Sequence, residues 1–146
     1  MIKIYTIGFT EKTAEQFFGL LTGRDITCIT DTRVNNTGQL AGFAKARDLA
    51  WFAGTIGKIS YQHHPDLAPS RELLARYRAK EITWPEYELE YLNLIDMRGV
   101  KEKFPVETLH QHCLLCSEHD PRHCHRRLLA EYLQASRADV EIVHLK

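Results

Sequence analysis

The segment from Cys113 to Leu133 constrains the fold more than any other part of the chain. Its first four residues, Cys113 to Cys116, form a short apolar run that is typical of a central strand in a parallel sheet. Asp120 and Pro121 then indicate a helix start, because aspartate caps free amides and proline needs no N–H in the first turn. An apolar stripe with helical spacing follows: Cys124, Leu128, Leu129, Tyr132 and Leu133. The segment therefore predicts a buried strand, a tight turn and a helix packed on the sheet.

Three reactive types of side chain meet where this strand joins this helix. His125 falls near the middle of the apolar stripe, in the first helical turn, so its imidazole should point inward. Cys116 ends the strand, and Glu118 follows two residues later. Open α/β sheets bind their ligands in such places, beyond the carboxyl end of a strand and beside a helix N-terminus. The alternative is a capped helix whose histidine only bonds a backbone carbonyl.

Further strands are predicted along the chain, with helical patterns between them. The strand-like runs are residues 3–7, 25–32, 58–62, 113–116 and 140–145. The helical patterns are residues 10–21, 43–56, 70–77, 83–98 and 105–111. Alternating strands and helices imply a parallel sheet with helices on both faces. We therefore expect one α/β domain over residues 1–146, a three-layer sandwich of about five mainly parallel strands, with a helical insertion at about 66–100.

The composition is that of an ordinary soluble globular protein. Lys plus Arg and Asp plus Glu both number 19, so the formal net charge is zero. This balance argues against a protein held on nucleic acid or a membrane mainly by bulk charge. The chain has no run of membrane-spanning length and no signal-peptide layout at its N-terminus. Its four cysteines sit singly in apparent core elements, so we expect four free thiols and a cytoplasmic protein.

Polar residues also follow the other predicted strands. Asp31 and Arg33 end the second strand and lie on the same side of it, because side chains alternate every two residues. His64 follows the third strand. The carboxyl ends of parallel strands lie along one rim, so these residues should gather near Cys116 and Glu118. The sequence thus predicts one polar site at the C-terminal rim of the sheet.

The same residues resemble a known family. The longest motif, Leu-Cys-Ser-Glu-His-Asp-Pro-Arg-His-Cys-His-Arg-Arg, covers residues 115–127, and shorter ones lie at 5–8, 31–33 and 61–69. In this order they resemble the bacterial family called domain of unknown function 488 (DUF488), over nearly the full chain. The resemblance implies a small cytoplasmic α/β protein and leaves the reaction open. Its motif positions fall here on Asp31, Arg33, His64, Cys116, Glu118, Cys124, His125 and Arg126.

One loop departs from the family pattern. Many relatives continue after Arg33 with serine, proline and arginine, whereas this chain has Val34, Asn35 and Asn36. The resemblance therefore assigns no substrate contact to this loop.

Two catalytic interpretations centre on Cys116. A thiolate nucleophile is the first, because a helix N-terminus and His125 could lower the pKa of the thiol. A phosphatase-like loop is the second, since Arg122 follows Cys116 with the spacing Cys-x5-Arg. A phosphate-binding loop needs free backbone amides and no acidic side chains, however. This loop carries Glu118 and Asp120, which would repel a phosphate. The thiolate is therefore the better of the two.

Two other interpretations stay open. Zinc accepts ligands such as Cys116, His119, Cys124 and His125, although their spacing matches no tight zinc knuckle. Alternatively, arginines around a helix N-terminus could bind the phosphate of a nucleotide or nucleic acid without catalysis. The helix over residues 83–97 carries Trp84, Tyr87 and Tyr91, but their regular spacing favours core packing over a base-stacking surface.

We interpret the chain as an enzyme that acts on an anionic small molecule or nucleotide-like group at the rim. Cys116 is the expected nucleophile, and Glu118 and His125 are the expected acid–base pair. The helix dipole disfavours the imidazolium and Glu118 favours it, so the pKa of His125 should lie near neutral pH. The alternatives are an anion-binding or nucleic-acid-associated module without catalysis, and a metal-binding protein that uses its cysteines and histidines.

The expected anion-binding residues lie on the neighbouring strand ends and on the helix. Arg33, His64 and Arg126 would hold the anion, and Asp31 would orient Arg33. No cofactor, metal or membrane partner is assigned from the sequence.

Overall fold

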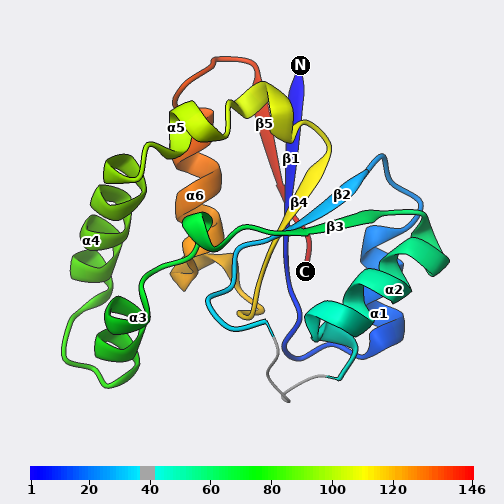
Figure 1. Cartoon of the computed structure of the whole chain (residues 1–146), viewed down its shortest axis with the longest axis horizontal. Helices are drawn as coiled ribbons and strands as arrows, with labels where there is room; N and C mark the ends of the chain where they lie inside the picture. Colours follow the sequence, from blue (N-terminus) through cyan, green and yellow to red (C-terminus); the bar gives the residue numbers. More distant parts are fainter. Residues whose placement is uncertain (37–41) are drawn as a thin grey trace.

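The computed structural model describes residues 1–36 and 42–146. Within these residues a five-stranded sheet forms the centre of the molecule (Figure 1). Its strands are β1 (Ile2–Gly8), β2 (Cys28–Asp31), β3 (Ser60–His63), β4 (His112–Cys116) and β5 (Val140–His144). The spatial order is β3-β2-β4-β1-β5, and all neighbouring strands run parallel. The predicted parallel sheet of about five strands is confirmed.

Helices cover both faces of this sheet (Figure 1). One face carries α1 (Ala14–Leu21) and α2 (Ala46–Gly57), and the other carries α3 (Arg71–Arg78), α4 (Trp84–Met97), α5 (Val100–Lys103) and α6 (His125–Gln134). Short 3-10 helices are η1 (Gly42–Ala44), η2 (Pro65–Leu67), η3 (Val106–Leu109) and η4 (Pro121–His123). No helix in the described residues is long and apolar enough to cross a membrane.

Successive strand residues face two separate apolar cores, as a three-layer sandwich requires. Ile4 and Leu114 belong to the core beneath α3–α6, whereas Ile7 and Leu115 belong to the core beneath α1 and α2. All four side chains are fully buried. The predicted α/β sandwich is therefore confirmed.

Local signals explain where α4 begins and which side it buries. Thr83 Oγ1 accepts a hydrogen bond from the backbone N–H of Glu86 at 3.3 Å, and Glu86 Oε1 accepts one from the N–H of Thr83 at 3.0 Å. This is a capping box, which satisfies free donors at the helix start. Tyr87 and Tyr91 are 2% and 0% exposed and share a core with α6. These two tyrosines pack in the core, as their spacing indicated.

The segment after β4 differs from the expected single helix. Asp120 does act as a cap, since its carboxylate accepts a hydrogen bond from the N–H of Arg122 at 2.9 Å, but it caps only the short turn η4. Cys124 then has an extended backbone, with φ −138° and ψ 139°, and α6 starts at His125. The expectation of one continuous helix from Pro121 was wrong. A capping pair fixes where a helical turn begins, whereas tertiary contacts decide how far it continues.

The strand ends line up along one rim, as parallel pairing requires. Asp31 at the end of β2 lies opposite Leu115 of β4 and His63 of β3, and Gly8 at the end of β1 lies opposite Cys116. The chain segments that follow these residues therefore meet at the same edge of the sheet.

Candidate functional site

A pocket of about 360 Å³ opens at the C-terminal rim of the sheet. Its walls come from the segments after β2 and β4, from the start of α6, and from α3 and α4. Four residues expected at the site line this pocket: Arg33, Cys116, Glu118 and His125. The volume is within the usual range for small-molecule sites, roughly 300–1,000 Å³.

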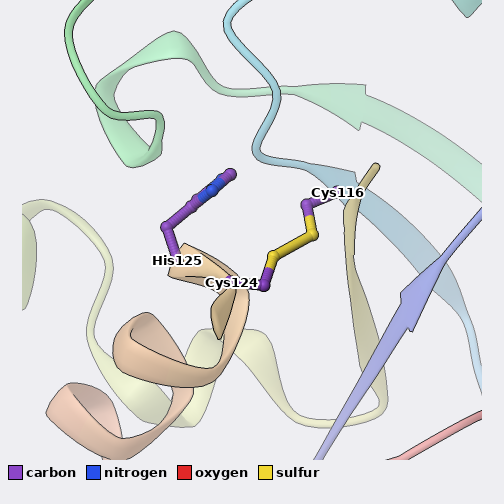
Figure 2. A group of neighbouring side chains, drawn as sticks. All are labelled: Cys116, Cys124 and His125. Carbon is purple, nitrogen blue, oxygen red and sulfur yellow. A yellow bond between two sulfur atoms is a disulfide. The ribbon is translucent and has the colours of Figure 1, made fainter. Parts of the chain in front are cut away.

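Cys116 and Cys124 form a disulfide at the pocket wall (Figure 2). Cys28 and Cys113 are free and buried. In this structure two of the four cysteines are therefore joined, which differs from the expectation of four free thiols. That expectation placed Cys124 on a helical stripe, whereas its extended backbone directs the side chain toward the end of β4. Cys113 does face away from this pair, into the core beneath α1 and α2.

His125 lies beside the two sulfur atoms (Figure 2). One ring nitrogen of His125 and the sulfurs of Cys116 and Cys124 all lie within 4.8 Å of one another. All three residues are buried and line the pocket. We refer to Cys116, Cys124 and His125 as the cysteine–histidine cluster.

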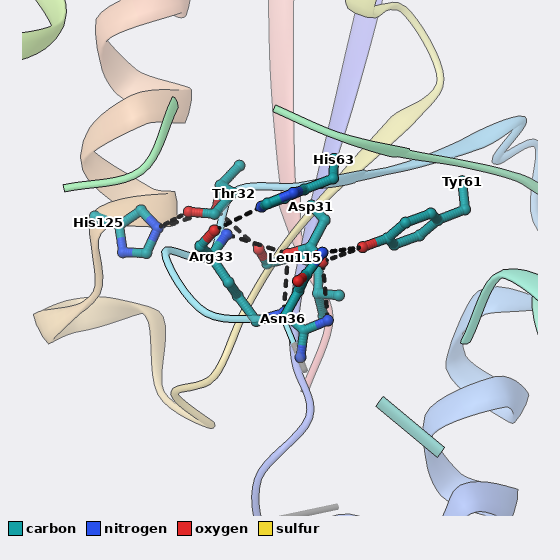
Figure 3. Close-up of polar contacts among 8 residues, drawn as sticks. All are labelled: Asp31, Thr32, Arg33, Asn36, Tyr61, His63, Leu115 and His125. Atoms are coloured by element: carbon teal, nitrogen blue, oxygen red, sulfur yellow. Dashed lines mark hydrogen bonds and ion pairs between the residues drawn. The ribbon is translucent and has the colours of Figure 1, made fainter. Parts of the chain in front are cut away.

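The orientation of the His125 ring is fixed by Thr32, which follows β2 (Figure 3). Nε2 of His125 lies 2.8 Å from the carbonyl oxygen of Thr32 and 3.0 Å from its Oγ1. The Thr32 hydroxyl donates its own proton to the carbonyl of Leu115 at 2.8 Å, so toward His125 it is an acceptor. Nε2 therefore carries the hydrogen, and Nδ1 retains the lone pair. Thr32 was not among the site residues predicted from the sequence.

The imidazole of His125 is neutral at physiological pH. Burial lowers its pKa to about 4, and the positive charge of Arg126 acts in the same direction. The expected value near neutral pH was wrong. It assumed contact with Glu118, whereas the Glu118 side chain is exposed and the ring bonds Thr32.

A buried carboxylate holds Arg33 in place (Figure 3). Asp31 is fully buried; its Oδ1 accepts a hydrogen bond from Arg33 Nε at 2.9 Å, and its Oδ2 accepts one from Nη2 at 2.8 Å. The hydroxyl of Tyr61 also donates to Oδ2, and His63 Nε2 lies 2.9 Å from the carbonyl oxygen of Arg33. Such a bidentate pair fixes the guanidinium plane and leaves Nη1 free of Asp31.

Arg126 braces the loop after β4 and does not line the pocket. Its side chain is 0% exposed. It donates to Thr6 Oγ1 at 3.2 Å, to Cys116 Sγ at 3.2 Å, to the carbonyl of His119 at 3.1 Å, and to the carbonyl of Glu118. Burial lowers its pKa to about 10. The guanidinium expected to hold an anion is thus engaged by the protein's own atoms.

Two other residues weighed from the sequence lie away from the pocket. His64 packs against the ring of Phe104, with ring centroids 4.9 Å apart, and its Nε2 lies 2.9 Å from Gln62 Oε1. The Arg122 side chain is 81% exposed and pairs with Asp120 at 2.8 Å. The phosphatase-like interpretation therefore lacks the arginine it requires.

The pocket wall that α3 and α4 contribute was not predicted from the sequence. Arg71 and Arg78 lie seven residues apart, which places them on the same side of α3, and both line the pocket. Trp84 lines it too, stacked on Tyr87 with ring centroids 5.1 Å apart. The spacing of the two arginines was a usable signal, but only tertiary packing places α3 over the rim.

Comparison with known proteins gives one match. A protein-family model described as "Domain of unknown function DUF488" matches residues 13–133. No curated protein and no solved structure matches the chain. The matched range contains every residue that lines the rim pocket.

Proposed function

Because the chain belongs to the DUF488 family, whose description assigns no function, we propose its function from the rim pocket: an enzyme that acts on an anionic small molecule. One observation carries the proposal. The cysteine–histidine cluster and several arginines line the same pocket at the carboxyl ends of parallel strands. Ligand sites of open α/β sheets lie in this position.

The charges around the pocket favour an anionic ligand. Arg71 and Arg78 approach from α3 with exposed side chains, and Arg33, whose charge is paired with Asp31, approaches from the end of β2. Glu118 is the only acidic residue among the described residues that line the pocket. Guanidinium groups bind carboxylates and phosphates with paired hydrogen bonds. A phosphate or carboxylate group is therefore the expected common part of the substrate.

The aromatic wall favours a planar group next to that anion. Tyr77 and Trp84, which are both partly exposed, line the pocket next to the exposed ring of His123. Aromatic side chains stack on nucleobases of any sequence. A nucleotide-like molecule combines both features, and its size suits the cavity.

The proposed reactive groups are those of the cluster and Glu118. In the thiol form Cys116 is the candidate nucleophile, because Arg126 Nη1 lies 3.2 Å from its sulfur and favours the thiolate. His125 is neutral and can accept a proton, and Glu118 is the second acid–base candidate. The proposed compartment is the reducing cytoplasm, where the Cys116–Cys124 pair would be held as thiols.

We expect adenosine 5′-monophosphate to bind more tightly than adenosine, by at least about tenfold, and Arg78→Ala to remove most of that difference. A hydrogen bond to a charged group is worth about 1.5–3 kcal/mol, and about 1.4 kcal/mol is tenfold in affinity. Isothermal titration calorimetry on the reduced protein measures the affinities, and Arg137→Ala serves as the control. Arg137 pairs with Asp139 and Glu107, away from the pocket.

Equal binding of the nucleoside and the nucleotide, or no binding of either at millimolar concentration, would overturn the nucleotide-like assignment. Tight binding of an oligonucleotide with a steep salt dependence, unaffected by Arg78→Ala, would instead favour a nucleic-acid-associated module.

A further inference from the structure

We infer that the thiol form of the cysteine–histidine cluster binds one Zn²⁺ ion. The two sulfurs and the ring nitrogen lie within 4.8 Å of one another, and thiolate and imidazole are the ligands zinc prefers. On one tetrahedral zinc ion with bonds of about 2.0–2.3 Å, such ligand atoms are roughly 3.5–3.8 Å apart. The three side chains therefore need only small adjustments to surround an ion.

The backbone separation of the cysteines also suits a metal. The Cα atoms of Cys116 and Cys124 are 7.6 Å apart. Disulfides usually join Cα atoms about 4.4–6.8 Å apart. Two thiolates on one zinc ion stand farther apart than two bonded sulfurs, so they suit a wider backbone separation. The rim thus holds the thiols at a spacing that an ion between them would fill.

Thr32 prepares His125 for this role. Metal-binding histidines almost always donate their second ring N–H to a carbonyl or carboxylate, which fixes the tautomer and the ring plane. Here Nε2 bonds the Thr32 carbonyl at 2.8 Å, and Nδ1 is left to bind the ion. Thr32 is itself fixed, because its backbone N–H donates to the carbonyl of Leu115 at 3.0 Å.

The charge of the site permits a buried ion. Two thiolates and Zn²⁺ sum to zero, so binding adds no net charge beside the buried Arg126. Arg126 Nη1, 3.2 Å from Cys116 Sγ, would donate a hydrogen bond to a metal-bound thiolate. Each thiol loses its proton to solvent when the ion binds. His119 is not a fourth ligand, because its Nδ1 lies 3.1 Å from Lys12 Nζ and outside the cluster.

The fourth coordination position would face the pocket, because all three ligand residues line it. Zinc sites with three protein ligands and one open position are typical of catalysis, whereas structural sites use four protein ligands. Zinc binding at this cluster does not depend on the proposed function. Only a catalytic role for the open coordination position rests on the proposal that the protein is an enzyme. A zinc-bound Cys116 is a ligand, so the reactive position would then be the open one, and not the Cys116 sulfur.

The test is a metal titration of the reduced protein. The disulfide is reduced with a phosphine, the phosphine is removed without oxygen, and Co²⁺ and Zn²⁺ are added in turn. We expect one Co²⁺ per chain, with a thiolate-to-cobalt charge-transfer band and intense tetrahedral d–d bands that Zn²⁺ displaces. Cys116→Ser, Cys124→Ser and His125→Gln should each weaken Zn²⁺ binding at least 100-fold. Cys28→Ala and Cys113→Ala are the matched controls and should bind as the wild type does.

A second measurement keeps the test independent of the folding of the variants. In the wild type, bound Zn²⁺ should protect Cys116 and Cys124 from alkylation, as read by peptide mass spectrometry. Absence of the cobalt bands, or Zn²⁺ binding without protection of these two cysteines, would overturn the zinc site. Nucleotide binding measured on the same samples separates the two proposals. If the protein binds the nucleotide but not Zn²⁺, only the zinc site is overturned. If it binds Zn²⁺ but not the nucleotide, only the anion-binding function is overturned.

Discussion

Replacing Gly8 with alanine should destabilise the protein by about 3 kcal/mol, the upper part of the range for overpacked sites. Gly8 ends β1 directly beside the loop after β4. A Cβ atom there would collide with the carbonyl group of Glu118 and would lie 2.7 Å from Arg126 Nη1. The carbonyl is backbone, and Arg126 is held by several hydrogen bonds, so neither can move aside cheaply. The clash would displace the loop that carries Glu118 from the rim.

Gly19→Ala is the matched control for this substitution. Gly19 is exposed within α1, and a Cβ atom there would have no neighbour within 4 Å. Alanine in a helix is more favourable than glycine by roughly 0.5–1 kcal/mol, so this variant should be slightly more stable than the wild type. Urea unfolding followed by circular dichroism measures both. Equal stability of the two variants would contradict the close approach of β1 to the loop.

Replacing Arg126 with methionine should also cost about 3 kcal/mol. The substitution keeps the apolar stem but leaves the carbonyls of Glu118 and His119 without their donor, and each unsatisfied group costs about 1–3 kcal/mol. Arg126→Lys should not restore stability, because a single ammonium cannot reach acceptors spread around a planar guanidinium. The same unfolding measurement applies.

Arg122→Met is the control for this prediction. Its salt bridge to Asp120 is at the surface, with the arginine 81% exposed, so stability should change by less than about 1 kcal/mol. The pair of variants also separates two roles for Arg126. An Arg126→Met protein that is as stable as the wild type but no longer binds adenosine 5′-monophosphate would contradict the bracing role and support the anion-binding role expected from the sequence.

The sheet and its rim could be predicted from the sequence because they depend on local patterns. Short apolar runs alternate with amphipathic segments, and parallel pairing then places all carboxyl ends at one edge. Asp31 and Arg33 therefore lie near Cys116, although the two segments are far apart in the chain. The start of α4 could also be predicted, because a capping box and a proline in the first turn are recognised from residues that are neighbours in the sequence.

The details of the site could not be predicted because they depend on tertiary contacts. A single extended residue, Cys124, interrupts the expected helix and brings its sulfur to Cys116. Arg126 follows two cluster residues in the sequence, yet it points into the loop and not into the pocket. Arg78 reaches the pocket only because α3 lies over the rim. Periodicity shows which side of a helix is buried, but not against which neighbour.

The proposed function requires that Cys116 lie in a positively charged pocket that small anions can enter. The direct measurement is the alkylation rate of Cys116 in the reduced, metal-free protein, with anionic iodoacetate and neutral iodoacetamide, resolved by peptide mass spectrometry. Positive pockets raise the rate constants of anions by roughly tenfold or more at low salt. We therefore expect the iodoacetate-to-iodoacetamide rate ratio at Cys116 to exceed that of an unfolded peptide by about tenfold, and to fall with added salt and with Arg78→Ala. A ratio equal to that of the peptide, unchanged by salt or by Arg78→Ala, would contradict an anion-binding active site at this rim.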